Sequence, residues 1–295
     1  MNTAPVGTPP ARGHGVRVGL HRGWIEFRKA VTSGQELWGA LFFPVIALIV
    51  MYLLRGSTVP GTTFSLGSQA VPGILALNIV MAGMTGLAVT LTMDREDGTL
   101  LRAKAVPNGV LGYFTGRLLS RAGVTLLGLV VLLVPAALLF TGLRLGDPAG
   151  WLTLAWVLAL GLAATMPIGA VIGALFNSTQ GLSVVMLPIM LLTALSGIFY
   201  PVSAFPDWLQ WIAQLFPIYW LGLGLRSALL PDALAAAEIG DSWRHLETVG
   251  ALGVWAVAGC LLAPVLLRRT ARHESGSRVA ARQEKAVQRM DAARR

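Results

Sequence analysis

Long, nearly uncharged apolar runs are the feature of this sequence that most constrains its fold. Residues of the set AVILMFWYC make up 55% of the 295, and only 13% are charged. Soluble domains do not carry uninterrupted apolar runs of about 18 to 26 residues, whereas a helix that crosses a bilayer needs that length. We therefore expect an all-α polytopic membrane protein rather than a barrel of short alternating strands. Six runs qualify as transmembrane helices: 37–54, 71–93, 118–141, 151–176, 182–200 and 249–267.

The basic residues predict the orientation of these spans. Five lie before the first span, five in the segment 94–121 and nine after Leu267, which leaves four of the 23 elsewhere. In a six-span arrangement the three rich segments share one side, and the positive-inside rule places that side in the cytoplasm. We expect a multi-pass protein of the cell (plasma) membrane with both termini cytoplasmic.

The polar composition excludes several other classes of protein. The net charge of +9 resides at membrane flanks and in a tail, so lipid headgroups are a better partner than nucleic acid. Apart from Arg121 the six runs contain no charged residue, which disfavours a transporter driven by an ion gradient. No lysine stands in a Gly-Lys-Ser/Thr phosphate loop, so any ATP must be bound by another subunit. No histidine lies in a span to serve an intramembrane enzyme.

The polar stretch 94–121, DREDGTLLRAKAVPNGVLGYFTGRLLSR, is the strongest candidate for function. Acids precede a Gly-Thr pair and bases follow it, an order that suits the dipole of a short helix capped by its own acids. The Pro-Asn-Gly sequence at 107–109 then ends this helix before the next span. The segment is interpreted as a surface helix suited to docking onto a soluble partner, and the alternative is a solvated loop.

A second unusual stretch, 196–230, is apolar but interrupted by prolines. Each half is too short to cross about 30 Å of hydrocarbon at 1.5 Å per residue, so a pair of re-entrant or interfacial helices is expected. Pro206 suits the first position of one helix, with Asp207 at its positive end. Four apolar side chains would then share one face: Trp208, Trp211, Ile212 and Leu215. Tyr200, Tyr219 and Trp220 would add to an aromatic belt at the outer interface.

The remaining segments complete the predicted organisation. Residues 1–20 are rich in Pro and Gly and are expected to be disordered. Residues 21–36 have Trp24, Phe27 and Val31 at helical spacing among charges, typical of an amphipathic helix in the headgroup region, with a solvated linker as the alternative. The transmembrane domain is predicted over 21–267, and residues 268–295 form a basic cytoplasmic tail.

Two motifs resemble one known family. DREDGT, followed by a proline turn, is similar to the ERExGT signature of the ABC-2 type transporter permeases, which include the daunorubicin/doxorubicin-resistance exporter membrane proteins. SGIFYPVSAFPDWLQWIAQLFPIYWLGLGLR resembles that family's SG…P…LPxWL…NP…R pattern. The chain departs from the family at Leu100 and Leu101, where an acid is common, and at Phe216, where the pattern has Asn.

The resemblance implies a role for each stretch. The first would be a coupling helix that contacts a separate ABC ATPase subunit, through Asp94, Glu96, Asp97, Gly98, Thr99, Arg102, Lys104 and Pro107. The second would be a re-entrant hairpin that forms an outer exit gate, with Gly197, Phe199, Tyr200, Pro201, Phe205, Pro206, Trp208, Pro217 and Arg226. For any single gate aromatic, anchoring at the interface is the alternative.

The implied function is that of the membrane subunit of an ATP-driven exporter of a hydrophobic or amphipathic small molecule, such as a drug, antibiotic or lipid. The subunit itself would carry no cofactor, because ATP and Mg²⁺ would bind the partner ATPase. It would work as a homodimer or as a heterodimer with a similar permease. An ATPase-independent channel or assembly factor is the alternative that the sequence leaves open.

Overall fold

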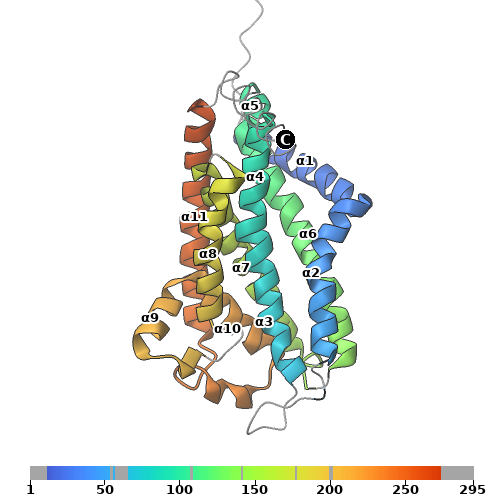
Figure 1. Cartoon of the computed structure of the whole chain (residues 1–295), viewed down its shortest axis with the longest axis vertical. Helices are drawn as coiled ribbons and strands as arrows, with labels where there is room; N and C mark the ends of the chain where they lie inside the picture. Colours follow the sequence, from blue (N-terminus) through green and yellow to red (C-terminus); the bar gives the residue numbers. More distant parts are fainter. Residues whose placement is uncertain are drawn as a thin grey trace, which may run out of the picture.

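The computed structural model describes residues 12–53, 56, 66–106, 109–140, 142–176, 178–198 and 202–273, and the regular structure in this part of the chain is helical. The elements are α1 (Arg12–Thr32), α2 (Gly34–Leu53), α3 (Leu66–Val80), η1 (Met81–Gly86), α4 (Leu87–Glu96), α5 (Thr99–Lys104), α6 (Gly109–Leu139), α7 (Pro148–Leu175), α8 (Thr179–Leu195), η2 (Val202–Ala204), α9 (Asp207–Leu215), α10 (Pro217–Leu229), η3 (Asp232–Ala237) and α11 (His245–His273). The long helices run side by side in an upright bundle (Figure 1).

Among the described residues, five helical stretches are long and apolar enough to cross a membrane: Gly34–Leu53, Gly67–Glu96, Gly109–Leu139, Pro148–Leu175 and His245–Thr270. They match five of the six predicted spans, and the second is continuous through α3, the π-helical η1 and α4. The polytopic all-α class is therefore confirmed.

The remaining predicted span, 182–200, is shorter than expected. Its helix α8 has 17 residues and ends at Leu195. Gly197 adopts a left-handed backbone (φ 75°), which cannot continue a right-handed helix. Residues 199–201 lie outside the described residues.

The two ends of the bundle carry different elements. α5 lies beside the last turns of α11 at one end, near α1, whereas α9 and α10 lie at the other end (Figure 1). α8 starts at the α5 end, next to the end of α7, and finishes at the opposite end, where Ile198 lies against Gly73 near the start of α3. It therefore connects the two ends.

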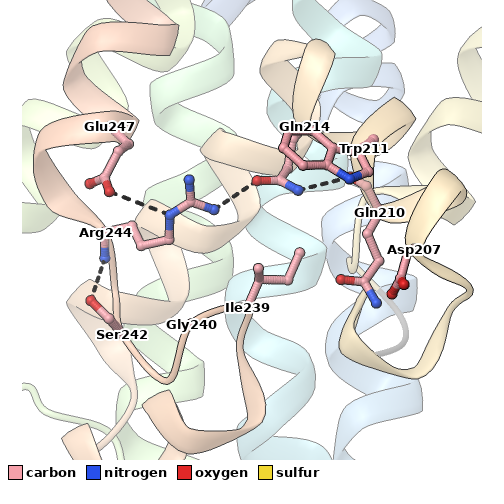
Figure 2. A pocket seen from close by; sticks show the side chains of 9 residues that line it. All are labelled: Asp207, Gln210, Trp211, Gln214, Ile239, Gly240, Ser242, Arg244 and Glu247. Atoms are coloured by element: carbon pink, nitrogen blue, oxygen red, sulfur yellow. Dashed lines mark hydrogen bonds and ion pairs between the residues drawn. The ribbon is translucent and has the colours of Figure 1, made fainter.

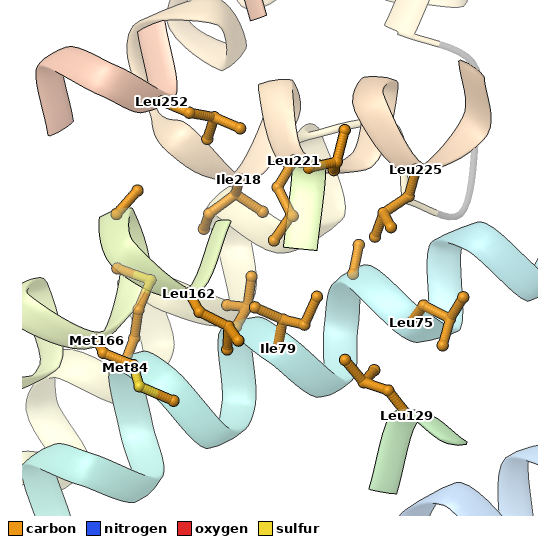
Figure 3. Packing of buried hydrophobic residues seen from close by; sticks show 14 of the residues in the cluster. Leu75, Ile79, Met84, Leu129, Leu162, Met166, Ile218, Leu221, Leu225 and Leu252 are labelled. Carbon is orange, nitrogen blue, oxygen red and sulfur yellow. The ribbon is translucent and has the colours of Figure 1, made fainter. Parts of the chain in front are cut away.

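The core is organised around α7, which packs against α4, α10 and α11. Its Leu162 and Met166 belong to a buried cluster with Ile79, Met84 and Leu221 (Figure 3). A close backbone contact lies next to this cluster: a Cβ at Gly169 would lie 2.2 Å from the carbonyl oxygen of Gly83 and 2.6 Å from that of Met84. Small residues permit this approach of helices in lipid.

Helix α1 differs from the prediction in where it begins and in where its apolar side chains lie. It begins at Arg12, so residues 12–20 are helical rather than disordered, while residues 1–11 lie outside the described part. The reason is packing along α6: a Cβ at Gly19 would meet Thr115, and one at Gly23 would meet the Gly116 carbonyl. The residues of the predicted apolar face do not share one environment: Phe27 lies against Gly123 of α6, whereas Trp24 is exposed.

We predict that Gly169→Val destabilises the bundle by roughly 1–3 kcal/mol, because its side chain would overlap the η1 backbone. The measurement is thermal unfolding of the detergent-solubilised chain, followed by tryptophan fluorescence. Gly253→Val in α11 is the matched control, since a Cβ there meets nothing within 4 Å. Equal melting temperatures for the two variants would contradict the assigned contact.

Candidate functional site

The predicted coupling segment forms a tight turn between α4 and α5. Gly98 precedes α5 in a left-handed conformation (φ 73°) that few other residues adopt. The predicted short helix is present as α5, with Arg102 and Lys104 in its last turn, but no side chain caps it and its first turn contains no acid, so the prediction that it is capped by its own acids is wrong. The acids belong instead to the end of α4, where the helix dipole does not favour them.

Asp94 is held inside the protein by α6. The Arg117 guanidinium donates to both carboxylate oxygens, Nε to Oδ2 and Nη2 to Oδ1, each at 2.7 Å, and the Tyr113 hydroxyl donates to Oδ2 at 2.6 Å. Arg117 also pairs with Glu26 of α1 at 3.1 Å, and Glu26 pairs with Arg22 at 2.8 Å. Asp94 is 7% exposed and its carboxylate is fully engaged, so this residue joins α4 to α6 and, through Arg117, to α1.

Arg95 fastens the same turn to α7. Its Nη1 donates to three carbonyl oxygens at the carboxyl end of α7, those of Gly173 (3.3 Å), Ala174 (3.1 Å) and Phe176 (2.8 Å). Carbonyls at a helix end lack intrahelical donors, and a cation there is favoured by the helix dipole. The predicted set omitted Arg95, although the spacing of Leu87, Leu91 and Arg95 continues the buried stripe of α4.

The exposed part of the segment is small and contains acidic, basic and apolar side chains. Asp97, Arg102 and Lys104 are exposed, Val106 is 60% exposed, and Glu96 and Thr99 are half-buried. Arg102 Nη2 donates to the Thr99 hydroxyl at 3.0 Å, and Lys104 Nζ donates to the Arg272 carbonyl of α11 at 3.3 Å. Pro107 lies outside the described residues. We call this surface, residues 96–106, the foot. It offers charges of both signs and an apolar edge to a partner.

The second predicted stretch forms two short helices, as expected, in different environments. α9 exposes Trp208 (62%), Trp211 (73%) and Leu215 (67%), which share one face as the spacing predicted. Pro206 is the N-cap of α9 rather than its first residue. Phe205 is half-buried, and Pro217 is the buried first residue of α10.

α10 lies inside the bundle instead of at its surface. All of its residues are buried, because it packs against α3, α7 and α11. Tyr219 and Trp220 therefore do not belong to an outer aromatic belt, which corrects the prediction. Phe199, Tyr200 and Pro201 lie outside the described residues.

Arg226 of α10 fixes the hairpin to the chain around it. Its Nε and Nη2 donate to the Glu238 carboxylate at 2.6 and 3.0 Å, and its Nη1 donates to the Gly197 carbonyl at 2.9 Å. Both charged side chains are buried. Of the predicted gate residues, the structure thus brings Gly197 and Arg226 into direct contact. The sequence did not single out Glu238.

Two more exposed ion pairs, both of Arg144, lie at the same end. Arg144 donates to Asp147 at 2.7 Å and to Asp232 at 2.5 Å. The hydrogen bond from Arg144, together with one from the backbone N–H of Ala149, lowers the pKa of the Asp147 carboxyl.

We expect Arg226→Met to lower the free energy of unfolding by about 3–5 kcal/mol, because it leaves the Glu238 carboxylate buried without its partner. Arg226→Met combined with Glu238→Met should recover most of that loss. Arg144→Met is the control, since its more exposed pairs contribute only about 0–1 kcal/mol. Denaturant titration of the detergent-solubilised variants measures these values; a double variant no more stable than Arg226→Met would contradict the pairing.

Sequence comparisons relate the chain to known proteins. The family model described as ABC-2 family transporter protein matches residues 51–265. The chain is also similar to a Mycobacterium tuberculosis protein named "Probable doxorubicin resistance ABC transporter permease protein DrrC", found in strains CDC 1551 / Oshkosh and ATCC 25618 / H37Rv. The two sequences are 23% identical over 242 residues, which are 80% of this chain and 82% of the relative. The matched residues run from the end of α2 into α11 and include the foot and the hairpin, so the chain belongs to the ABC-2 family of transporter proteins.

Proposed function

We propose that this chain is the membrane subunit of an ATP-binding-cassette exporter, which moves a hydrophobic or amphipathic small molecule out of the cell with ATP hydrolysed by a separate subunit. The single observation that carries the proposal is the foot, an exposed turn fastened to the bundle through buried charges. The family model and the relative named for doxorubicin resistance support it.

The proposed topology has six spans, with α8 as the fifth. Its 17 residues extend about 26 Å at 1.5 Å per residue, close to the roughly 30 Å hydrocarbon core of a bilayer. Because α8 connects the two ends of the bundle, counting it as a span places α1 and the end of α11 on one side. The basic residues assign that side to the cytoplasm, with α1 as an elbow helix at the inner face of the plasma membrane.

The proposed mechanism transmits force from an ATPase to the spans through the foot. Movement of α5 is passed to α4 across the Gly98 turn, from Arg95 to α7, and from Asp94 to α6 and α1. Three spans and the elbow helix would respond together. ATP and Mg²⁺ bind the partner subunit in this scheme, and the chain contributes only the receiving surface.

The translocation pathway is proposed to require two membrane subunits, either two copies of this chain or this chain with a similar permease. The largely apolar spans suit hydrophobic cargo. The α9–α10 hairpin would form the outer gate, with α9 at the membrane surface.

Reversing the two positive charges of the foot should uncouple the ATPase subunit from the membrane subunit. We expect Arg102→Glu combined with Lys104→Glu to lower co-purification of the ATPase subunit, and drug-stimulated ATP hydrolysis, about tenfold or more, because both cations are exposed. Arg28→Glu combined with Lys29→Glu is the matched control: it makes the same charge change at the same end of the bundle, on exposed residues of α1.

Wild-type values for the foot variant in both assays would remove the coupling role. An efflux assay with a panel of amphiphiles, in cells that express the chain with and without the ATPase, tests the alternative of an ATPase-independent channel or assembly factor. Efflux independent of the ATPase would favour that alternative.

A further inference from the structure

A recess of about 570 Å³ opens at the end of the bundle opposite the foot (Figure 2). α9 forms one wall, the loop around Gly240 forms the floor, and the first turn of α11 forms the other wall. This volume is within the range of sites for drug-sized ligands. The buried ion pair between Arg226 of α10 and Glu238 does not line it.

The α9 wall presents hydrogen-bond acceptors and an aromatic ring. Asp207, Gln210, Trp211 and Gln214 line the recess and follow the spacing of one helical face (Figure 2). The Gln210 amide nitrogen donates to the Phe205 carbonyl at 2.8 Å, which leaves its amide oxygen as an acceptor. Asp207 is exposed, and its carboxylate has no hydrogen bond or ion pair within the part of the chain that the structure describes.

Among the described residues that line the recess, the only cation is Arg244 on the opposite wall, and its guanidinium is already paired. Its Nη1 donates to Gln214 Oε1 at 2.7 Å, its Nε lies 3.5 Å from Glu247 Oε1, and its guanidinium stacks over the Trp220 ring at 4.8 Å. Its backbone is left-handed (φ 46°), as is that of Asp241 (φ 51°). Non-glycine residues in this conformation cost energy and persist where the surroundings hold them in place. Arg244 is therefore a fixed part of the wall.

The charges that line the recess leave one negative charge unpaired. Glu247 offsets Arg244, whereas Asp207 remains free beside the Gln210 oxygen and the Trp211 ring, which is 73% exposed. A carboxylate and an amide oxygen accept hydrogen bonds from an ammonium group, and an indole face attracts a cation or stacks with an aromatic ring. We propose that this recess binds cationic amphiphiles, with an amine held by Asp207 and Gln210 and an apolar body against Trp211.

The proposal rests on the proposed function for the outward position of the recess and for the assignment of the ligand as cargo. The binding itself depends on neither ATP nor a partner. Binding can therefore be measured on the purified full chain in detergent, where failure of the exporter proposal would leave it unchanged.

Three dansyl probes of similar ring structure separate charge from hydrophobicity: dansylcadaverine is a cation, dansylamide is neutral and dansylglycine is an anion. Energy transfer from tryptophan to the dansyl group reports binding. We expect the cation to bind most tightly and the anion most weakly. Asp207→Asn should weaken dansylcadaverine binding about tenfold, as the loss of a charged hydrogen bond predicts. Asp207→Glu should restore most of the affinity.

Asp241→Asn is the matched control, because it removes the same charge at the same end without changing a residue that lines the recess, and Asn tolerates the left-handed backbone. It should leave the affinity unchanged. Equal affinity for the three probes, or wild-type affinity in Asp207→Asn, would overturn the proposal. An equal loss in Asp241→Asn would also overturn it, since a diffuse surface charge would then explain the preference. Unfolding temperatures within a degree or two of wild type confirm that the variants are folded.

Discussion

The foot is attached to the bundle through two neighbouring buried charged residues, Asp94 and Arg95. Asp94 and Arg95 are 7% and 4% exposed, and charges so buried persist only where partners replace the lost hydration. Asp94 finds Arg117 and Tyr113 on α6, and Arg95 finds the carbonyl end of α7. Since the two side chains leave α4 in different directions, they fix its end to two separate helices. The foot cannot swing freely on the Gly98 turn without breaking a contact that is costly to lose.

Where a glycine or proline marks the end of a helix, the sequence predicted that end better than it predicted what surrounds the helix. Gly98 permits a left-handed turn, Pro206 and Pro217 fix φ, and the turn and the two helix starts occur at or next to these residues. The partner of Asp94 was not predictable in this way. Arg117 is 23 residues away, and its contact depends on how α4 and α6 cross. The sequence predicts a single docking surface for the part of the stretch 94–121 that precedes the Pro-Asn-Gly turn, because it does not show which of the charges there find partners inside the bundle.

Hydrophobicity also failed to distinguish the environments of α9 and α10, and the reason is specific to membranes. In water an apolar side chain gains free energy by leaving the solvent, so hydrophobic residues mark the core. In lipid the hydrocarbon tails are as apolar as the protein interior, so hydrophobic residues no longer distinguish the core of the protein from its surface. Trp211 is 73% exposed and Trp220 is 6% exposed, although both belong to apolar helices of one short stretch. The clearest signal in α10 was Arg226, because a buried cation requires a buried partner such as Glu238.

Helix α7 connects the end of the bundle near the foot with the end that holds α10. The carbonyl oxygens at its carboxyl end accept hydrogen bonds from Arg95, Gly169 lies so close to the η1 backbone that a Cβ there would overlap it, and Leu162 belongs to the cluster that includes residues of α10 (Figure 3). A close-packed interface of this kind transmits displacement with little compression. Under the proposed function, a push on the foot tilts α4 and α7 as one unit, and the outer hairpin follows because α10 is enclosed by the helices that move. The π-helical turn of η1 lies at this contact, where the hydrogen-bond pattern of the second span is already altered. That turn is the natural place for α4 to bend relative to α3.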